Sequence, residues 1–387
     1  MIRRWARTLA TRRRSRLACD SAVVPAERIL TINVGSSSVK LRLIDGADAV
    51  AGSWDFPPGA PADQLLAAAG EGTFDAVGHR FVHGGPRLGQ TRLATDEVRA
   101  ELRRAIPLAP LHNRAALELM EQLQSALSGV PHLVCFDTAF HRTMPREAAI
   151  YPVPWDWTEG IGVRRYGFHG LSHAYAARRT AELLGRRQVD QRIVTCHLGA
   201  GASLAAVKGG ASVDTTMGFT PNEGLMMATR SGSVGPGALL WVLRETGLSP
   251  EAADDALEHG AGLAGVSGVS ADMREVIAAE QAGSERAALA IAVYVHRLRA
   301  GIAAMAAAME AVDAICFTGG VGEHAARVRA AACGGLRFLG VELDRGANEA
   351  GAGDRVISIE AAATATVIVT AREELEIAAE VRRALEA

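Results

Sequence analysis

The sequence predicts an α/β fold made of two domains, and three segments rich in small residues carry that prediction. Residues 29–46 and 192–210 each read as an apolar strand, a turn of small residues and a second strand. Residues 314–332 read as a strand, a glycine turn and a helix. A helix N-terminus presents N–H groups and the positive end of a dipole, so this order favours phosphate binding. We therefore expect two facing domains that each offer a turn to a phosphate.

Helices and strands alternate in the first half of the chain. After the first hairpin, residues 75–82 read as a strand, 95–106 and 115–127 as helices, and 132–136 as a strand. Alternation of this kind implies parallel strand pairing within an α/β sheet. Functional side chains are then expected at the strand ends, where such a sheet opens to its ligands.

The second half repeats the order of strand, turn and strand between residues 192 and 216. A long alanine-rich helix is predicted over residues 284–310, and its apolar residues lie nearly all round, which predicts burial between layers. The chain then runs through a strand in residues 362–370 and a helix in residues 371–387. We expect this helix to fold back on the first domain.

Domain boundaries follow from this order of elements. We expect a first domain of residues 29–140 plus 371–387 and a second domain of residues 141–370, after a disordered basic tail of residues 1–28. The first 18 residues hold seven arginines and no acidic residue. We prefer a solvated tail or a start codon placed too early, and an organelle transit peptide is the alternative.

Composition excludes several function classes. Of 387 residues, 49% are hydrophobic and 22% charged, as in ordinary globular proteins. The formal net charge of -2 offers no dense cationic face for nucleic acid. No uninterrupted apolar run reaches the roughly 20 residues that cross a bilayer, so we expect neither nucleic acid nor membrane as a partner. The five cysteines form no CxxC pair, which indicates a reducing cytoplasm.

Two arginines stand among small residues rather than on charged helix faces. Arg80 follows an apolar strand and precedes the Gly84-Gly85 turn, and Arg230 precedes another glycine-rich stretch. A guanidinium binds carboxylate or phosphate through a planar fork of donors. We therefore weigh anion binding at Arg80 and Arg230 against the default of a solvated surface arginine.

Acidic residues and histidines at element ends are further candidates. Asp137 follows an apolar strand, where it orients a nucleophile, holds a metal or caps the next turn. His169 and His173 are four residues apart, but the glutamate of an H-E-x-x-H zinc motif is missing. This leaves an imidazole beside developing phosphoryl charge, or a hydrogen-bonded core histidine. Glu373 is either a helix N-terminal acid or a magnesium ligand opposite a phosphate.

Eleven motifs occur in one order: NVGSSSVK, GHRFVHGG, LAPLHN, FDTAFHRTMP, RRYGFHGLSH, CHLGAGAS, SVDTTMGFTP, ATRSG, SGVSADMRE, FTGGVGE and EELEIA. Together they resemble the acetate kinase family, over residues 29–382. The resemblance implies a two-domain actin-like ATPase (ribonuclease H-like) fold with an interdomain cleft. It implies reversible phosphoryl transfer from ATP to acetate, giving acetyl phosphate and ADP, with Mg²⁺ or alternatively Mn²⁺. It also implies a homodimer formed through the second domain.

The resemblance assigns roles by position. The catalytic residues would be Asp137, His169 and Arg230. Magnesium would be held by Asn33 and Glu373, while Arg80 clamps the substrate and Ser36 and Ser38 line the phosphate path. The acetate methyl would lie in a small apolar pocket of Val82, Leu111, Phe168 and Pro221. The nucleotide and its phosphates would contact Lys40, His197, Gly199, Gly201, Asp272, Met273, Arg274, Gly320, Val321, Gly322 and Glu323.

Several positions depart from the family pattern, and they leave alternatives open. Ala200 and His324 stand where asparagine is usual, and Gly235 stands where an aspartate usually precedes the proline; Ala228 and Arg114 are milder departures. Loss of one preorganised donor costs on the order of 10² to 10³ in rate. The alternatives are a propionate or other short-chain carboxylate kinase, a kinase with a donor such as pyrophosphate, or a catalytically weakened nucleotide-binding paralogue.

Overall fold

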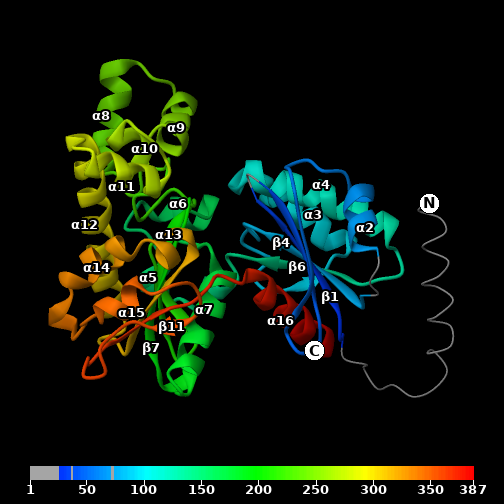
Figure 1. Cartoon of the computed structure of the whole chain (residues 1–387). Helices are drawn as coiled ribbons and strands as arrows, with labels where there is room; N and C mark the ends of the chain where they lie inside the picture. The colour runs from blue at the N-terminus through cyan, green and yellow to red at the C-terminus, as the bar shows by residue number, and fades with distance from the viewer. Residues whose placement is uncertain (1–25, 36–37, 71–73) are drawn as a thin grey trace. The chain divides into compact units, whose positions relative to one another are not determined.

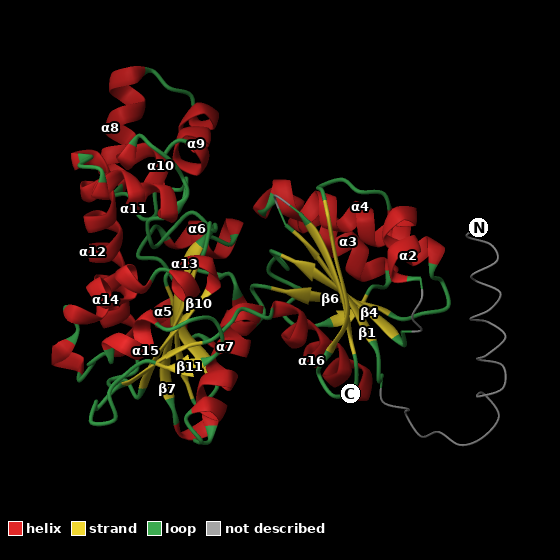
Figure 2. Cartoon of the chain, viewed as in Figure 1, coloured by secondary structure: helices red, strands yellow, loops and turns green. Residues whose placement is uncertain are grey.

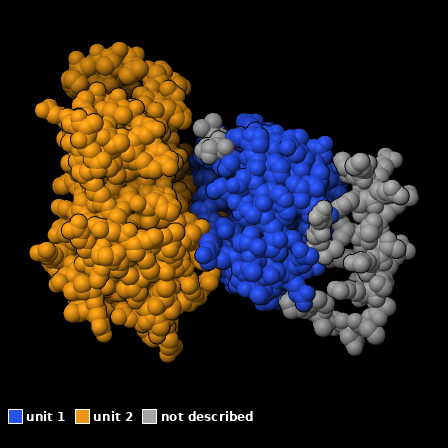
Figure 3. Space-filling view, in the orientation of Figure 1, with its two compact units in different colours: residues 1–139, 372–387 blue, residues 140–371 orange. Residues whose placement is uncertain are grey.

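The computed structural model describes residues 26–35, 38–70 and 74–387, and it divides into two compact units (Figure 1). Unit 1 comprises the described residues up to Ala139 together with Arg372–Ala387, and unit 2 comprises Phe140–Ala371 (Figure 3). Each unit contains a six-stranded sheet with helices packed on it (Figure 2). The α/β class predicted from the alternation of helices and strands is therefore confirmed.

The predicted tail needs a correction at its end. Residues 1–25 lie outside the described residues, as does Ser36 of the predicted phosphate path. Residues 26–28, however, belong to the folded unit, because the backbone N–H groups of Glu27 and Arg28 each donate to Asp75 Oδ2 at 3.0 Å. Ala26 is buried as well.

Unit 1 is built on a sheet in the order β3-β2-β1-β4-β6-β5. Strand β1 pairs antiparallel with β2 and parallel with β4, which is in turn parallel to β6. The carboxyl ends of β1, β4 and β6 therefore meet at one edge of the sheet. The strands are β1 (Ile29–Val34), β2 (Val39–Ile44), β3 (Val50–Phe56), β4 (Ala76–Phe81), β5 (Arg92–Leu93) and β6 (His132–Phe136).

Helices cover both faces of this sheet (Figure 2). One face carries α2 (Ala62–Ala69), α3 (Asp96–Ala105) and α4 (Pro110–Ala126), with the short η1 (Ile106–Leu108) between the last two. The other face carries α16 (Glu373–Glu386), which packs on β1 and β4. Helix α4 begins five residues before the predicted start at residue 115, because Pro110 occupies its first turn, where a missing N–H costs nothing.

Unit 2 repeats the same topology, with its sheet in the order β11-β12-β10-β7-β8-β9. Strands β7, β8 and β9 form an antiparallel meander, and β10 is parallel to both β7 and β12. The prediction that residues 29–46 and 192–210 are equivalent hairpins is confirmed. The strands are β7 (Arg192–Leu198), β8 (Ala202–Lys208), β9 (Ala211–Thr215), β10 (Ala314–Thr318), β11 (Arg355–Val356) and β12 (Ala365–Ile368).

Unit 2 also carries many helices around and beyond its sheet. Those that bear on the site are α7 and α13, at the ends of the sheet strands. The helices are α5 (Arg146–Ala149), α6 (Trp155–Ile161), α7 (Gly170–Leu183), α8 (Pro236–Thr246), α9 (Pro250–His259), α10 (Gly262–Ser267), α11 (Met273–Gln281), α12 (Glu285–Ala308), α13 (Gly319–His324), α14 (Ala326–Gly334) and α15 (Arg345–Glu349), with single turns η2 (Phe140–Thr143), η3 (Gln188–Asp190) and η4 (Arg337–Leu339).

Two helices differ from the prediction. Helix α12 contacts β7, β8 and β9 of the sheet as well as α10, α11 and α14, so it lies between two layers as predicted. It is only partly buried, however, and Leu289 is 56% exposed. Among the described helices, α12 alone is long and apolar enough to pass a test for membrane spans by length and composition. The helix predicted up to residue 332 is split at Ala325, because the side chain of Arg329 donates hydrogen bonds to the carbonyls of Gly322 and Glu323.

Candidate active site

The first group of predicted residues lies in unit 1, where three parallel strands end together. Asn33 is near the end of β1, Arg80 is near the end of β4, and Asp137 follows β6. Glu373 is the first residue of α16. The parallel register of β1, β4 and β6 places the three strand ends at one edge, so these residues meet although Asn33 and Glu373 are 340 positions apart.

Arg80 is the centre of this group. It forms a bidentate ion pair with Asp137, through Nε to Oδ1 at 2.8 Å and Nη2 to Oδ2 at 2.5 Å. Its Nη1 donates to Asn33 Oδ1 at 2.8 Å, and Asn33 Nδ2 donates to Glu373 Oε2 at 2.9 Å. The Asp137 side chain is 1% exposed and that of Arg80 is 13% exposed. The fork geometry fixes the plane of the guanidinium.

Charges in this group determine what it can bind. Burial lowers the pKa of Arg80, but the carboxylates of Asp137 and Glu373 outweigh it and raise the pKa above its ordinary value, so the guanidinium stays charged. Two carboxylates around one guanidinium leave an excess of one negative charge. Lys40 lies opposite Asn33 in the β1–β2 register and brings a further cation to the same strand ends.

The donor set of this group fits a magnesium ion. Mg²⁺ takes one or two carboxylates and fills its other positions with water and phosphate oxygens. Glu373 supplies a carboxylate, and Asn33 supplies an amide beside it. In the part of the chain that the structure describes, no three His, Cys, Asp or Glu side chains form a metal cage of protein atoms alone.

The second group lies in unit 2, at the turn between β7 and β8. The turn is closed by a hydrogen bond from the Gly199 N–H to the Gly201 carbonyl at 2.9 Å. A β-carbon at Gly201 would lie 3.2 Å from His169 Cε1 and 3.5 Å from Arg230 Nη1. The glycine therefore lets both side chains approach the backbone, and two predicted catalytic residues meet at a predicted phosphate turn.

Local backbone geometry aims His169 at this turn. It precedes α7 with φ 55° and ψ 25°, a left-handed conformation that is uncommon for a residue other than glycine. Its Nδ1 lies 2.9 Å from Ser203 Oγ, and its ring stacks on His197 with ring centroids 4.3 Å apart. His197 Nδ1 lies in turn 2.7 Å from Ser172 Oγ. These contacts hold the imidazole in one orientation.

Arg230 is held in place by contacts within unit 2. Its Nη1 donates to the Pro221 carbonyl at 3.1 Å, and its Nε lies 3.2 Å from Glu258 Oε2. The carbonyl leaves the charge of the guanidinium in place, whereas Glu258 partly neutralises it. The Arg230 side chain is 22% exposed, so it remains accessible to an anion.

The residues of the predicted apolar pocket are found in both units. Val82 follows β4, two residues after Arg80, and is buried in unit 1. Leu111 lies in the first turn of α4, and its side chain is outside the description. Phe168 is buried directly before His169, and Pro221 contacts Arg230 in unit 2. Each described member thus lies close to a residue of the candidate site.

Apart from Lys40 in unit 1 and the residues at the β7–β8 turn, the predicted nucleotide residues fall into two sets. Gly320, Val321, Gly322 and Glu323 lie in α13, directly after β10. Asp272 caps α11 by accepting from the Arg274 N–H at 2.8 Å and pairs with the Arg274 guanidinium at 2.5 Å. Met273 is buried, so its side chain belongs to the core of unit 2.

Sequence reasoning missed several residues that hold the site together. Ser203, Ser172 and Thr195 bond to the histidines around His169, and Glu258 pairs with Arg230. The hairpin register contained a signal for Ser203, because a turn at Gly199–Gly201 places it opposite His197. Glu258 left no signal, since its position on α9 relative to Arg230 depends on tertiary packing.

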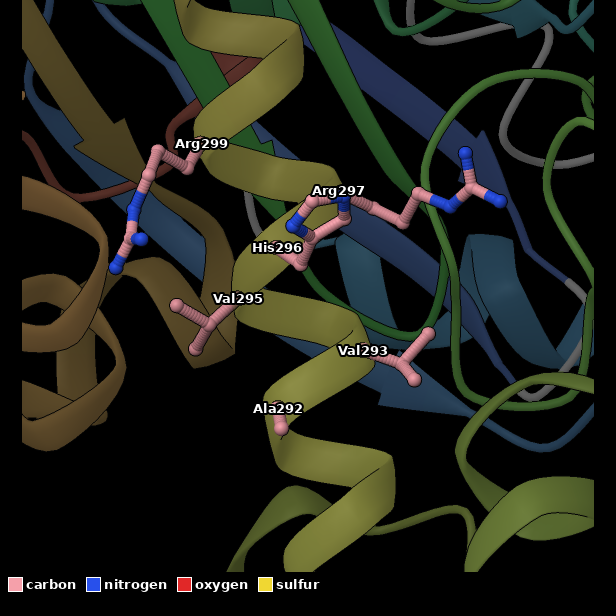
Figure 4. A pocket seen from close by; sticks show the side chains of 6 residues that line it. All are labelled: Ala292, Val293, Val295, His296, Arg297 and Arg299. Atoms are coloured by element: carbon pink, nitrogen blue, oxygen red, sulfur yellow. The ribbon is translucent and has the colours of Figure 1, made fainter. Parts of the chain in front are cut away.

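A hollow of about 680 Å³ beside α12 holds none of the predicted residues. It is lined by Ala292, Val293, Val295, His296, Arg297 and Arg299. Figure 4 shows that the side chains of Arg297 and Arg299 point to opposite sides of the helix. They do not converge on one ligand, so this hollow is a weaker candidate for the active site than the two groups described above.

Comparisons with known proteins agree on one family. A sequence model of the Acetokinase family matches residues 64–379. The acetate kinase of Microcystis aeruginosa is 48% identical over 304 residues, which are 79% of this chain and 76% of that protein. The crystal structure of Porphyromonas gingivalis acetate kinase superposes with a TM-score of 0.86 at 37% identity, covering 93% of this chain and 100% of that one. A propionate kinase from Francisella tularensis gives a TM-score of 0.83 at 32% identity, covering 92% of this chain and 98% of that one.

Proposed function

This chain belongs to the acetokinase family, and from that premise we propose that it catalyses reversible transfer of a phosphoryl group from ATP to acetate, giving acetyl phosphate and ADP. The observation that carries the proposal is the assembly of Asn33, Arg80, Asp137 and Glu373 at three strand ends. In unit 2, His169 and Arg230 meet at Gly201. We assign roles in this reaction to residues of both groups.

The proposed mechanism needs positioning and charge neutralisation rather than a covalent intermediate. In-line phosphoryl transfer spreads negative charge over three equatorial oxygens, and fixed cations stabilise that charge. Arg80, whose plane is set by Asp137, binds the carboxylate or the phosphoryl oxygens. Arg230 and His169 neutralise the transferring phosphoryl group. Asp137 acts by orienting Arg80.

Magnesium is the proposed metal, with Mn²⁺ as an alternative because it also accepts oxygen ligands. Glu373 and Asn33 would hold the ion, directly or through water. When bound, the ion would neutralise negative charge on the phosphates. The Glu373 carboxylate beside the Asn33 amide, at the strand ends, supports this assignment.

Acetate is the proposed acceptor, and propionate is the alternative that the likeness to the Francisella propionate kinase keeps open. One methylene in an apolar pocket is worth about 1–3 kcal/mol. The ratio of kcat/KM for the two acids decides between them. A ratio that favours propionate would replace acetate in the proposal.

ATP is the proposed donor, with α13 and the turn at Gly199–Gly201 on its phosphates. Three residues that depart from the family pattern are exposed, namely Ala200 in this turn, His324 at the end of α13 and Gly235 before α8. They motivate pyrophosphate as the alternative donor. Formation of acetyl phosphate with pyrophosphate and not with ATP would overturn the ATP assignment.

A homodimer in the cytoplasm is the proposed assembly. Helix α8 has no buried residue in the single chain, and it exposes Leu240, Trp241 and Val242, of which Trp241 is 58% exposed. A second copy of the chain, bound through the same helix, would cover these exposed apolar side chains. The cytoplasm is proposed because the five cysteines form no CxxC pair, which favours a reducing compartment. Sedimentation of Trp241→Glu as a monomer, with the unmodified chain as a dimer, would support the interface on α8.

The first experiment is a hydroxamate assay with acetate, ATP, Mg²⁺ and hydroxylamine, which traps acetyl phosphate as it forms. We expect ATP-dependent product that disappears when acetate is omitted. No product, together with nucleotide binding by calorimetry, would instead identify a non-catalytic nucleotide-binding paralogue.

A further inference from the structure

Behind His169 lies a chain of hydrogen bonds that the proposed mechanism does not use. His169 Nδ1 lies 2.9 Å from Ser203 Oγ, Ser203 Oγ lies 2.8 Å from His173 Nε2, and His173 Nδ1 lies 2.7 Å from Thr195 Oγ1. Ser203, His173 and Thr195 are fully buried. We call these four residues the histidine relay.

Ser203 couples the two imidazoles because its hydroxyl has one proton. It can donate to one ring nitrogen and must then accept from the other. If His173 Nε2 accepts, His169 Nδ1 must carry a proton; if His173 Nε2 carries the proton, His169 Nδ1 must accept. The tautomers of the two neutral histidines are therefore locked together.

Thr195 sets the direction of the relay. Its hydroxyl donates to the Ala205 carbonyl at 3.4 Å, and a carbonyl can only accept. Thr195 Oγ1 therefore accepts from His173 Nδ1–H, and His173 Nε2 accepts from Ser203. Burial, with His141 and His197 nearby, lowers the pKa of His173 well below its ordinary value, so this ring is neutral. Ser203 in turn accepts from His169 Nδ1–H.

Given the proposed function, we propose that Ser203, His173 and Thr195 are positioning residues that hold His169 in the Nδ1–H tautomer. Its Nε2, which would lie 3.3 Å from a β-carbon at Gly201, is then the nitrogen that gains and loses a proton. Protonation at Nε2 leaves every hydrogen bond of the relay in place. In the opposite tautomer, protonation would occur at His169 Nδ1. The hydrogen bonds of Ser203, His173 and Thr195 would then all have to reverse their direction. The relay thus lets His169 become a cation beside a phosphoryl group without reorganisation.

The direct test is the tautomer of His169 in the full-length protein. Ring ¹⁵N NMR of histidine-labelled protein distinguishes a protonated from an unprotonated ring nitrogen, and His169→Gln identifies the signals. We expect Nδ1 to carry the proton in the unmodified chain and a mixture of tautomers in Ser203→Ala. A His169 with its proton on Nε2 in the unmodified chain would overturn the proposal.

Kinetics separates positioning from general stability. We expect Thr195→Val and Ser203→Ala to lower kcat by roughly 10- to 100-fold, less than the roughly 10⁴-fold cost of a wrong tautomer in a serine-protease triad. The KM values for ATP and acetate should change by less than about threefold, because Ser203, His173 and Thr195 do not bind them. Thr195→Ser, unlike Thr195→Val, keeps the hydroxyl, and its kcat should stay close to that of the unmodified chain. Thr180→Val removes a buried hydroxyl of α7 that donates to the Ala176 carbonyl, and it is the matched control.

The outcomes separate this inference from the proposed function. An active protein whose kcat and His169 tautomer are unchanged in Thr195→Val and Ser203→Ala overturns the relay and leaves the kinase activity standing. A protein without kinase activity whose His169 carries the Nδ1 proton in a Ser203-dependent way supports the relay and overturns the function. If Ser203→Ala does not fold, Thr195→Val decides by the same two measurements.

Discussion

Units 1 and 2 share one topology but place opposite kinds of chemistry at the ends of their strands. In both, an antiparallel meander is followed by two parallel strands in the same order. The group in unit 1 is a buried ion-pair network of one guanidinium and two carboxylates. The group in unit 2 consists of hydroxyls and imidazoles that hold His169, beside the more accessible Arg230. The same scaffold therefore supplies fixed charge in one unit and an oriented proton site in the other.

The largest effect is expected from breaking the ion-pair network of unit 1. Arg80→Ala removes the bidentate ion pair of the buried Asp137 carboxylate, which costs about 3–5 kcal/mol of folding free energy. It should also lower kcat by roughly 10² to 10³. Denaturant unfolding and the hydroxamate assay measure the two effects. Arg80→Lys keeps the charge but loses the fork, so it should regain more stability than activity; an Arg80→Ala protein as active as the unmodified chain would contradict the role of Arg80.

Arg230→Ala sharpens the comparison because it should separate activity from stability. We expect a similar loss in kcat, roughly 10² to 10³. The folding free energy should fall by no more than about 1 kcal/mol, because the Arg230–Glu258 pair is partly exposed and screened by solvent. Thermal melting and steady-state kinetics on the same samples test this. A stability loss as large as that of Arg80→Ala would remove the difference between the two units.

Glu380 lies on α16 of unit 1, and it tests whether a buried carboxyl group outside the ion-pair network stays protonated in the folded state. Burial raises the pKa of Glu380 to about 7, helped by the nearby Glu376 and opposed by the hydrogen bond that the Thr91 hydroxyl donates. The folded state then holds a proton that the unfolded state has lost, so stability falls as pH rises from about 4.5 through 7. Glu380→Gln should abolish this fall and stabilise the protein by about 1–3 kcal/mol at pH 8. Glu386→Gln, exposed on the same helix, is the control; equal pH slopes for the two variants would contradict the buried proton.

The smallest effect is expected at Glu258, which neutralises part of the charge of Arg230 in unit 2. Glu258→Gln keeps the size of the side chain and removes its charge. We expect the KM for an anionic substrate to fall by a factor of about 2 to 5, which corresponds to less than 1 kcal/mol. Steady-state kinetics at low and high salt measures this, and the effect should shrink at high salt. A rise in KM would show that Glu258 positions Arg230 rather than competing with the substrate.

The sequence predicted strand ends better than it predicted the contacts behind them. Alternating helices and strands located Arg80 and Asp137, because hydrophobic periodicity sets where a strand stops. It could not show that Arg80 bonds to both Asn33 and Asp137, which depends on the parallel order of β1, β4 and β6. The break at Ala325 was also hidden, since it arises from the buried side chain of Arg329. The histidine relay could not be predicted either, because it depends on the register of the β7–β8 hairpin and on the packing of α7 against it.

The interrupted path of the chain through unit 1 has a consequence for synthesis. Its strands precede Ala139, whereas α16, which covers one face of β1 and β4 and begins with Glu373, follows the whole of unit 2. Unit 2 is contiguous and can fold while it emerges from the ribosome. Until α16 has been made, one face of the unit 1 sheet stays uncovered. Asn33 also lacks the hydrogen bond to Glu373 until then, because Glu373 is part of that helix. The order of translation thus keeps the kinase inactive until both units have been made.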